Sequence, residues 1–152
     1  MDAVFKKMNF KEHENVIVLN APESFHANME AMKPWANIKT NLRSKQIEFV
    51  VAFVTEQKEI DNLVPKIIPK LKDDALVWFC YPKKSSKNYT CNFNRDTGWE
   101  IMGKYDMEGV RMVAVDADWS ALRFRNVKHI KTMTRAKGWT LSKAGKAKTT
   151  GK

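Results

Sequence analysis

Short apolar runs alternate with helical stripes along most of the chain, and this alternation predicts an α/β fold. The runs at 15–20, 47–54 and 75–81 are almost continuously apolar, as strands are when both faces of a parallel sheet are covered. Residues 36–42 form a weaker strand candidate. Together these segments predict a mainly parallel sheet.

The segments between the strands carry helical periodicity. Phe25, Met29 and Met32 recur at i, i+4 and i+7, which predicts a helix that starts near Pro22 and ends before Pro34.

A second helical stripe runs over 60–71. Pro65 and Pro69 interrupt it, so we expect a kink or a restart there. Residues 95–105 predict a shorter helix that ends near Gly103.

The last two strand candidates, 110–118 and 120–125, meet at Trp119. This gap is too short for a crossover helix, so the two strands must be antiparallel. The sequence therefore predicts a three-layer, Rossmann-like, methyltransferase-like fold: a mostly parallel sheet with a C-terminal antiparallel hairpin. We expect one domain over 1–130 and a basic tail over 131–152 that has little to bury and is disordered.

The charge of the chain is concentrated at its C-terminal end. The net charge is +10, and no acidic residue follows Asp118. The body is therefore neutral and the last segment is basic, which argues against a uniformly basic nucleic-acid-binding domain.

The loop after the first strand lacks the residues that hold an adenosyl or dinucleotide cofactor. No glycine occurs between Asn20 and Gln46, and Asn41 and Arg43 stand where an acid for the ribose hydroxyls is expected. The sequence therefore predicts no cofactor.

Two loops at the carboxyl ends of the predicted strands combine hydrogen-bonding groups with positive charge. The candidate ligand-binding residues are Asn20, Ser24, Lys83, Lys84, Ser85 and Ser86, which suit phosphate or carboxylate groups. The alternative is a solvated basic loop with turn-forming serines.

Arg123 and Arg125 lie on one face of the strand 120–125, because side chains alternate along a strand. They could form an anion-binding or partner-binding face. The alternative is an edge strand whose charges prevent pairing with other chains.

The basic tail could hold nucleic acid through its charges and one indole ring. The residues concerned are Lys137, Trp139, Lys143, Lys146 and Lys148.

Groups with catalytic or metal-binding chemistry are sparse. The three histidines are scattered, and Asp116 and Asp118, expected on one strand face, have no identifiable partner. We therefore predict no catalytic residue, no metal site and no enzyme. Two widely spaced cysteines and the lack of an apolar leader or membrane span favour a reduced, cytoplasmic protein.

The segments "VIVLNAPESF", "VVAFVT", "LVWFCYPKKSS" and "VAVDADWSALRFR" resemble small bacterial proteins of unknown function, the DUF3052-like family. The resemblance covers about 8–126 and implies a Rossmann-like sheet without an established activity. The leading hypothesis is a non-enzymatic binding or regulatory module with an anion-accepting crevice for a small molecule or a protein partner. The alternatives are nucleic-acid association through the tail and a diverged S-adenosylmethionine-dependent methyltransferase.

Overall fold

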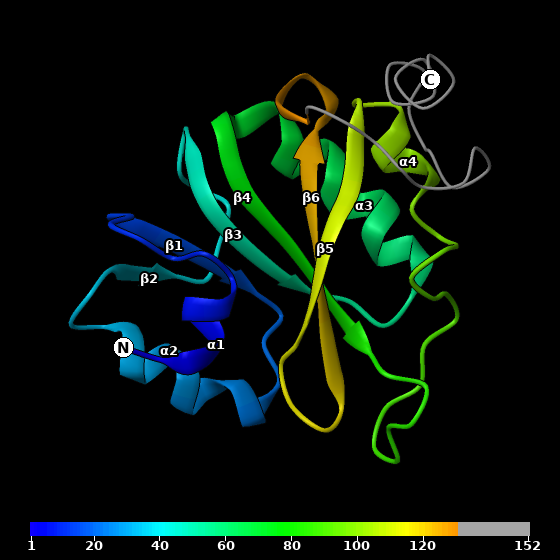
Figure 1. Cartoon of the computed structure of the whole chain (residues 1–152), viewed down its shortest axis with the longest axis horizontal. Helices are drawn as coiled ribbons and strands as arrows, with labels where there is room; N and C mark the ends of the chain where they lie inside the picture. Colours follow the sequence, from blue (N-terminus) through cyan, green and yellow to red (C-terminus); the bar gives the residue numbers. More distant parts are fainter. Residues whose placement is uncertain (131–152) are drawn as a thin grey trace.

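The computed structural model describes residues 1–130, which contain a six-stranded sheet of order β2-β1-β3-β4-β6-β5 (Figure 1). The first four strands are parallel, and the last two are antiparallel to their neighbours. This is the predicted sheet with its C-terminal hairpin. The strands are β1 (Asn15–Leu19), β2 (Asn37–Lys39), β3 (Ile47–Phe53), β4 (Leu71–Pro82), β5 (Met107–Ala114) and β6 (Trp119–Asn126).

Helices cover both faces of the sheet, which gives the predicted three layers. On one face lie α1 (Ala3–Lys7) and α2 (His26–Met32), preceded by a 3₁₀ turn at Glu23–Phe25. On the other lie α3 (Gln57–Ile67), a 3₁₀ turn at Ile68–Lys70, and α4 (Glu100–Gly103). Alternate residues of the central strands supply both cores: Phe53 and Trp78 face α1 and α2, whereas Ala52 and Phe79 face α3.

The strand order changes direction between β1 and β3. From β1 the chain goes to β2 on one side, and then crosses to β3 on the other side. The connecting helices α2 and α3 consequently lie on opposite faces. Open α/β sheets bind their ligands at such a switch point, beyond the carboxyl ends of the strands.

The N-terminal helix α1 was not predicted, because five residues are too few to show a clear period. Asp2 caps it: its carboxylate accepts hydrogen bonds from the backbone N–H groups of Val4 and Phe5, both at 3.1 Å. Val4, Phe5 and Met8 are buried against the sheet. Capping and tertiary burial therefore stabilise α1 more than helix propensity does.

The helix predicted around Pro65 forms with the proline inside it. The Glu56 side chain accepts a hydrogen bond from the third helical residue, Glu59, whose side chain in turn accepts one from the Glu56 backbone. The chain then changes to a 3₁₀ turn at Ile68, where Pro69 occupies an early position.

The C-terminal hairpin corrects two expectations. Trp119 is the first residue of β6 rather than the turn, because the turn lies just before it and Pro82 of β4 pairs with Trp119. Moreover, β6 lies between β4 and β5, so β5 is the edge strand. The expectation that 120–125 forms an edge strand is wrong: local alternation gives the faces of a strand but not its neighbours.

Candidate functional site

Strands β1, β3 and β4 end, and β6 begins, on the same side of the sheet, where the carboxyl ends of the parallel strands lie. We call this side the carboxyl edge; it is formed by strand ends and not by an edge strand. The loops that start at Asn20, Val54 and Lys83 leave from there. The switch point between β1 and β3 opens at the same edge. This is the part of the fold in which a ligand is expected.

Asn20 makes the turn that the sequence assigned to a missing glycine. Its φ is 57°, in the left-handed region that asparagine tolerates better than other residues with a side chain. The tight turn after β1 therefore exists without glycine. What a glycine would still add is room for a ligand to approach the backbone closely.

A row of aromatic rings joins the loop after β1 to the loop after β4. The ring centroids of Phe25 and Phe53 are 4.9 Å apart, those of Phe53 and Trp119 5.1 Å, and those of Trp119 and Tyr89 4.8 Å. Each ring comes from a different element: the 3₁₀ turn, β3, β6 and the loop after β4. The loops predicted to face each other are thus connected by packed rings.

Trp119 is buried and its indole N–H has no acceptor. Only 3% of the residue is exposed, and Nε1 has no hydrogen-bond partner among residues 1–130. By contrast, Nε1 of Trp78 donates to the Met8 carbonyl at 3.0 Å, and Nε1 of Trp99 donates to the Asn94 carbonyl at 2.8 Å. A buried donor without an acceptor costs about 1–3 kcal/mol. Trp119 is the residue that sequence reasoning missed, because no local pattern shows whether an indole will find an acceptor.

The loop that covers Trp119 is fastened to the β5–β6 turn. The Ser86 hydroxyl donates to Asp118 Oδ1 at 2.8 Å and accepts from the backbone N–H groups of Asn88 and Tyr89 at 3.3 and 3.1 Å. Asn88 Nδ2 donates to the other oxygen of Asp118 at 3.2 Å. The hydrogen-bonding capacity of the Ser86 hydroxyl is therefore used within the loop.

The β5–β6 turn is itself built by an aspartate. Asp116 Oδ1 accepts from the backbone N–H groups of Asp118 and Trp119 at 2.8 and 2.9 Å. The expectation that Asp116 and Asp118 share a strand face is wrong, because both lie in the turn between β5 and β6. Their carboxylates organise backbone and loop.

A cavity of about 780 Å³ lies beyond the end of β4 and is lined mainly by the segment 83–97. Lys83, Lys84 and Ser86 line it, together with Tyr81 and Met112. Burial raises the pKa of Tyr81 to about 12, and its hydroxyl donates to the Met112 sulfur at 3.2 Å. Tyr81 therefore stays protonated: it lines the cavity and donates a hydrogen bond, and it does not act as a base.

The structure separates the predicted ligand residues into two groups. Lys83, Lys84 and Ser86 border the cavity, whereas Asn20, Ser24 and Ser85 are not among its lining residues. The latter three are exposed to solvent. Ligand binding by these six residues stays a prediction, with the two loops acting at different places.

Nucleophilic and metal-binding groups are scarce in the described part of the chain. Within residues 1–130 no group of three or more His, Cys, Asp or Glu could hold a metal ion. Burial raises the pKa of both Cys80 and Cys91, so both remain thiols rather than reactive thiolates.

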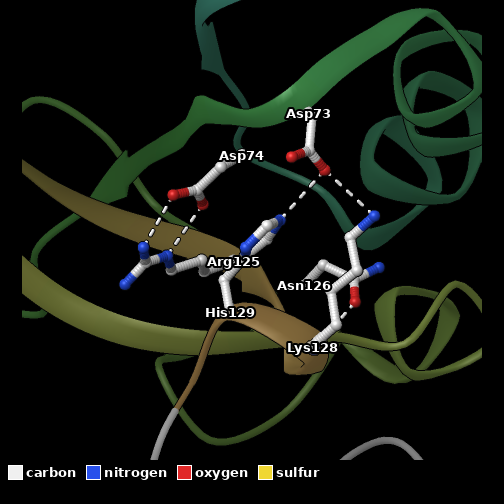
Figure 2. Close-up of polar contacts among 6 residues, drawn as sticks. All are labelled: Asp73, Asp74, Arg125, Asn126, Lys128 and His129. Atoms are coloured by element: carbon white, nitrogen blue, oxygen red, sulfur yellow. Dashed lines mark hydrogen bonds and ion pairs between the residues drawn. The ribbon is translucent and has the colours of Figure 1, made fainter.

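A charged cluster lies at the other end of the strands, where β4 begins and β6 ends (Figure 2). We call this end of the sheet the amino edge. Arg125 binds both carboxylate oxygens of Asp74, at 2.8 and 2.6 Å. Asp73 lies 3.0 Å from Lys128 Nζ and 3.2 Å from His129 Nε2. The hydrogen bond from Arg125 lowers the pKa of Asp74, and the hydrogen bond from Lys128 is the main cause of the lowered pKa of Asp73. Arg125 is thus neutralised within the fold.

Arg123 shares its face of β6 with Arg125, as predicted, since Leu122 and Phe124 pack on the other face. Unlike Arg125, it makes no ion pair with any residue of the described range. The anion-binding or partner-binding face stays a prediction.

Comparison with solved structures returns proteins of low sequence identity to this chain. An N-methyltransferase, NodS, from Bradyrhizobium japonicum has 14% identity and a TM-score of 0.43 over 74% of this chain and 85% of that chain. An RNA methyltransferase from Salinibacter ruber in complex with S-adenosyl-L-homocysteine has 10% identity and a TM-score of 0.44, over 89% and 98%. A protein in the NADB-Rossmann superfamily from Streptococcus agalactiae has 9% identity and a TM-score of 0.45, over 81% and 67%.

No family model matches the chain, and no curated protein matches it. The resemblance to the small bacterial family therefore stays a prediction. At these identities the solved structures bear on the fold alone.

The leading hypothesis from the sequence, a non-enzymatic binding or regulatory module, is corrected. The similar solved structures include methyltransferases, some in complex with S-adenosyl-L-homocysteine. The sequence argument rested on missing glycines. The left-handed Asn20 removes part of that argument.

Two further predictions concern the rest of the chain and its location. Nucleic-acid binding by Lys137, Trp139, Lys143, Lys146 and Lys148 falls outside the described residues and stays a prediction. Among the helices of residues 1–130, none has the length and apolar character of a membrane span. The cytoplasmic location stays a prediction.

Proposed function

We propose that the protein is a diverged S-adenosylmethionine-dependent methyltransferase whose cofactor enters at the carboxyl edge. The observation that carries this proposal is the buried indole N–H of Trp119, for which the described residues provide no acceptor. A ligand ring that stacks in the aromatic row and offers a nitrogen or oxygen would supply that acceptor.

The position of Trp119 supports the proposal. The indole contacts Phe53, which ends β3 at the switch point, and Phe53 contacts Phe25, just after the Asn20 turn. Asn20 supports it as well, because its left-handed backbone keeps the turn that brings a ligand to the end of β1. A flat, polar-edged ligand fits between these elements.

The part of the site that would bind the ribose hydroxyls of the cofactor lacks its usual acid. No acid occurs between Glu30 and Glu48, and the Asn41 side chain accepts a hydrogen bond from the Arg43 backbone N–H at 3.0 Å. The ribose hydroxyls would therefore meet an amide instead of a carboxylate, and a neutral acceptor binds hydroxyls less strongly. We accordingly expect weaker binding than an intact site would give.

The covering loop must move for an acceptor to reach Trp119. Ser86 and Asn88 hold this loop to Asp118, so their hydrogen bonds have to open when a ligand enters. Loops of this kind often exclude water from an active site after closing. Ser86 then acts as a latch of the loop.

When bound, the cofactor supplies an electrophilic methyl group. The cavity beyond β4 lies beside the covering loop and would receive the methyl acceptor, with Lys83 and Lys84 at its border. The chemistry of this lining suits an acceptor that carries a negative charge.

Calorimetric titration with S-adenosylmethionine and with S-adenosylhomocysteine tests the proposal. We expect saturable binding by the wild-type protein and affinity weakened by about tenfold in Trp119→Phe, which lacks the N–H donor. The matched control is Trp35→Phe, because Trp35 is 56% exposed and lies just before the start of β2, at the end of the sheet opposite to the site. No saturable binding at millimolar concentrations of either compound would refute the proposal, as would equal affinity of the wild-type and Trp119→Phe proteins.

The Asn20 turn offers a second test. Asn20→Gly keeps the left-handed backbone and opens space for the ligand, so we expect affinity to be retained or increased. Asn20→Val places a β-branched residue at positive φ, so we expect affinity to fall. Equal affinities in the two variants would remove this turn from the site.

A further inference from the structure

A β-bulge in β5 places two arginines directly opposite each other. Before the bulge Gly109 pairs with Phe124, and after it Arg111 pairs with Arg123, so Val110 is the extra residue. In an unbroken ladder Arg111 would lie opposite Leu122, on the face that packs against α3 and α4. The bulge moves Arg111 to the other face, beside Arg123.

The resulting pair is unfavourable without an anion. Like charges directly opposite each other on antiparallel strands repel, and their Cβ atoms are only about 5 Å apart. Arg125 and Arg111 both lower the pKa of Arg123, in addition to the larger effect of its burial. Two neighbouring positive charges that repel each other do not stabilise the sheet, so a structural role does not explain why they are paired.

The described residues do not neutralise the pair. The charge of Asp74 raises the pKa of Arg123, but both oxygens of Asp74 bind Arg125. Arg111 makes one long contact, 3.5 Å from Nη1 to Asn9 Oδ1. Within residues 1–130, no carboxylate forms an ion pair with either arginine.

Arg123 also has an unused donor. Its Nε is buried and has no hydrogen-bond partner in the described part of the chain. The side chain stands next to Trp78, which pairs with Arg123 across β4 and β6 and whose indole is fixed by the Met8 carbonyl. Arg123 thus lies between Trp78 of β4 and Arg111 of β5 in the sheet, and Arg111 is exposed.

We propose that Arg111 and Arg123 form a binding site for a phosphate group on the outer part of the sheet, separate from the carboxyl edge. Two guanidinium forks that face the same space offer more donors than the two oxygens of a carboxylate can use. A phosphate has enough oxygens to accept from both forks. The group can belong to free phosphate or to a phosphate monoester, since both present the same oxygens.

The site is distinct from the predicted face of Arg123 and Arg125. Arg125 is committed to Asp74, and Arg111, which the sequence did not mark, takes its place. The bulge in β5 brings Arg111 opposite Arg123, and the sequence alone does not indicate the bulge because it depends on how β5 pairs with β6.

The experiment is a titration of the full chain with inorganic phosphate and with adenosine monophosphate at constant ionic strength, followed by the NMR signal of the Arg123 Nε–H group and by calorimetry. We expect saturable binding that shifts this signal, and affinity lowered by about tenfold or more in Arg111→Gln and in Arg123→Gln. Lys66→Gln, which removes an equal charge from an exposed lysine of α3 on the other face of the sheet, serves as the matched control and should bind like the wild type.

Acetate and the two phosphates form separate arms of the test. Binding of both phosphates but not acetate supports the site, and binding of the monoester alone assigns it to phosphate esters. Equal loss in Lys66→Gln, equal binding of acetate, or an unshifted Arg123 signal would overturn it. Because S-adenosylmethionine carries no phosphate, failure here leaves the proposed methyltransferase function standing, and the converse also holds.

Discussion

The amino and carboxyl edges of the sheet differ in whether their polar groups have hydrogen-bond partners. At the amino edge Asp73 and Asp74 each have a basic partner within hydrogen-bond distance (Figure 2). At the carboxyl edge the Trp119 N–H is buried without an acceptor, and lysines border a cavity. The unsatisfied indole N–H is the reason why we propose that the cofactor binds at the carboxyl edge and not at the amino edge.

Substitutions at Trp119 test this contrast with the largest expected effect. Trp119→Ala should lower the free energy of unfolding by about 3–5 kcal/mol, because it empties the centre of the aromatic row. Trp119→Phe should cost far less, because it also removes a donor that has no acceptor. Urea unfolding of both variants measures the difference, and equal losses would mean that the indole N–H is satisfied in solution.

The next effect concerns the latch of the covering loop. Ser86→Ala removes a donor to Asp118 and an acceptor for two backbone N–H groups, so we expect a loss of about 1–2 kcal/mol. Amide exchange of Asn88 and Tyr89 should become faster. Ser85→Ala is the control, because Ser85 is exposed; if it speeds exchange equally, the latch assignment fails.

A smaller effect is expected at the amino edge and depends on pH. Asp74→Asn keeps a residue that tolerates the positive φ of 53° but removes the charge that binds Arg125. We expect a loss of about 0.5–1 kcal/mol at pH 7, since the pair is partly exposed.

The sign of the pH dependence follows from the lowered pKa of Asp74. The carboxylate stabilises the fold above its unfolded pKa of about 3.9, and this contribution is lost as the pH falls through the folded-state value. The difference between the wild type and Asp74→Asn should therefore shrink below pH 4 in chemical unfolding. A difference that does not change with pH would assign the effect to shape instead of charge.

The smallest effect on stability is expected for the cavity lysines. Lys84 is exposed and Lys83 half-buried, so the double variant Lys83→Ala/Lys84→Ala should unfold within about 0.5 kcal/mol of the wild type. Any anionic compound that binds the cavity should bind this variant more weakly. A large loss of stability would show that the lysines hold the loop, and unchanged binding of such a compound would remove them from the site.

The sequence predicted the strands well because their apolar residues are contiguous. The runs at 15–20 and 47–54 became β1 and β3 almost unchanged, and the alternation of Leu122, Arg123 and Phe124 gave the two faces of β6 correctly. By contrast β4 begins at Leu71, several residues early, since its exposed start lacks the apolar signal.

The candidate site was only partly predictable. The turn at Asn20 and the loop at Lys83 could be located from the ends of strands, but the unpaired Trp119 N–H depends on which acceptors the tertiary structure brings near. The Arg111–Arg123 pair depends on one extra residue in β5. Both features depend on which segments the fold brings together and in which strand register. A single sequence does not determine these while the neighbours of each strand are unknown.

The position of β4 has a consequence for synthesis on the ribosome. Its neighbour β3 precedes it in the chain, whereas its other neighbour, β6, begins only at Trp119. Until that segment leaves the exit tunnel, the outer edge of a long apolar strand offers unpaired backbone groups to any other nascent chain. Truncations that end before residue 119 should therefore aggregate, and the growing polypeptide should be a client of chaperones that shield exposed strands.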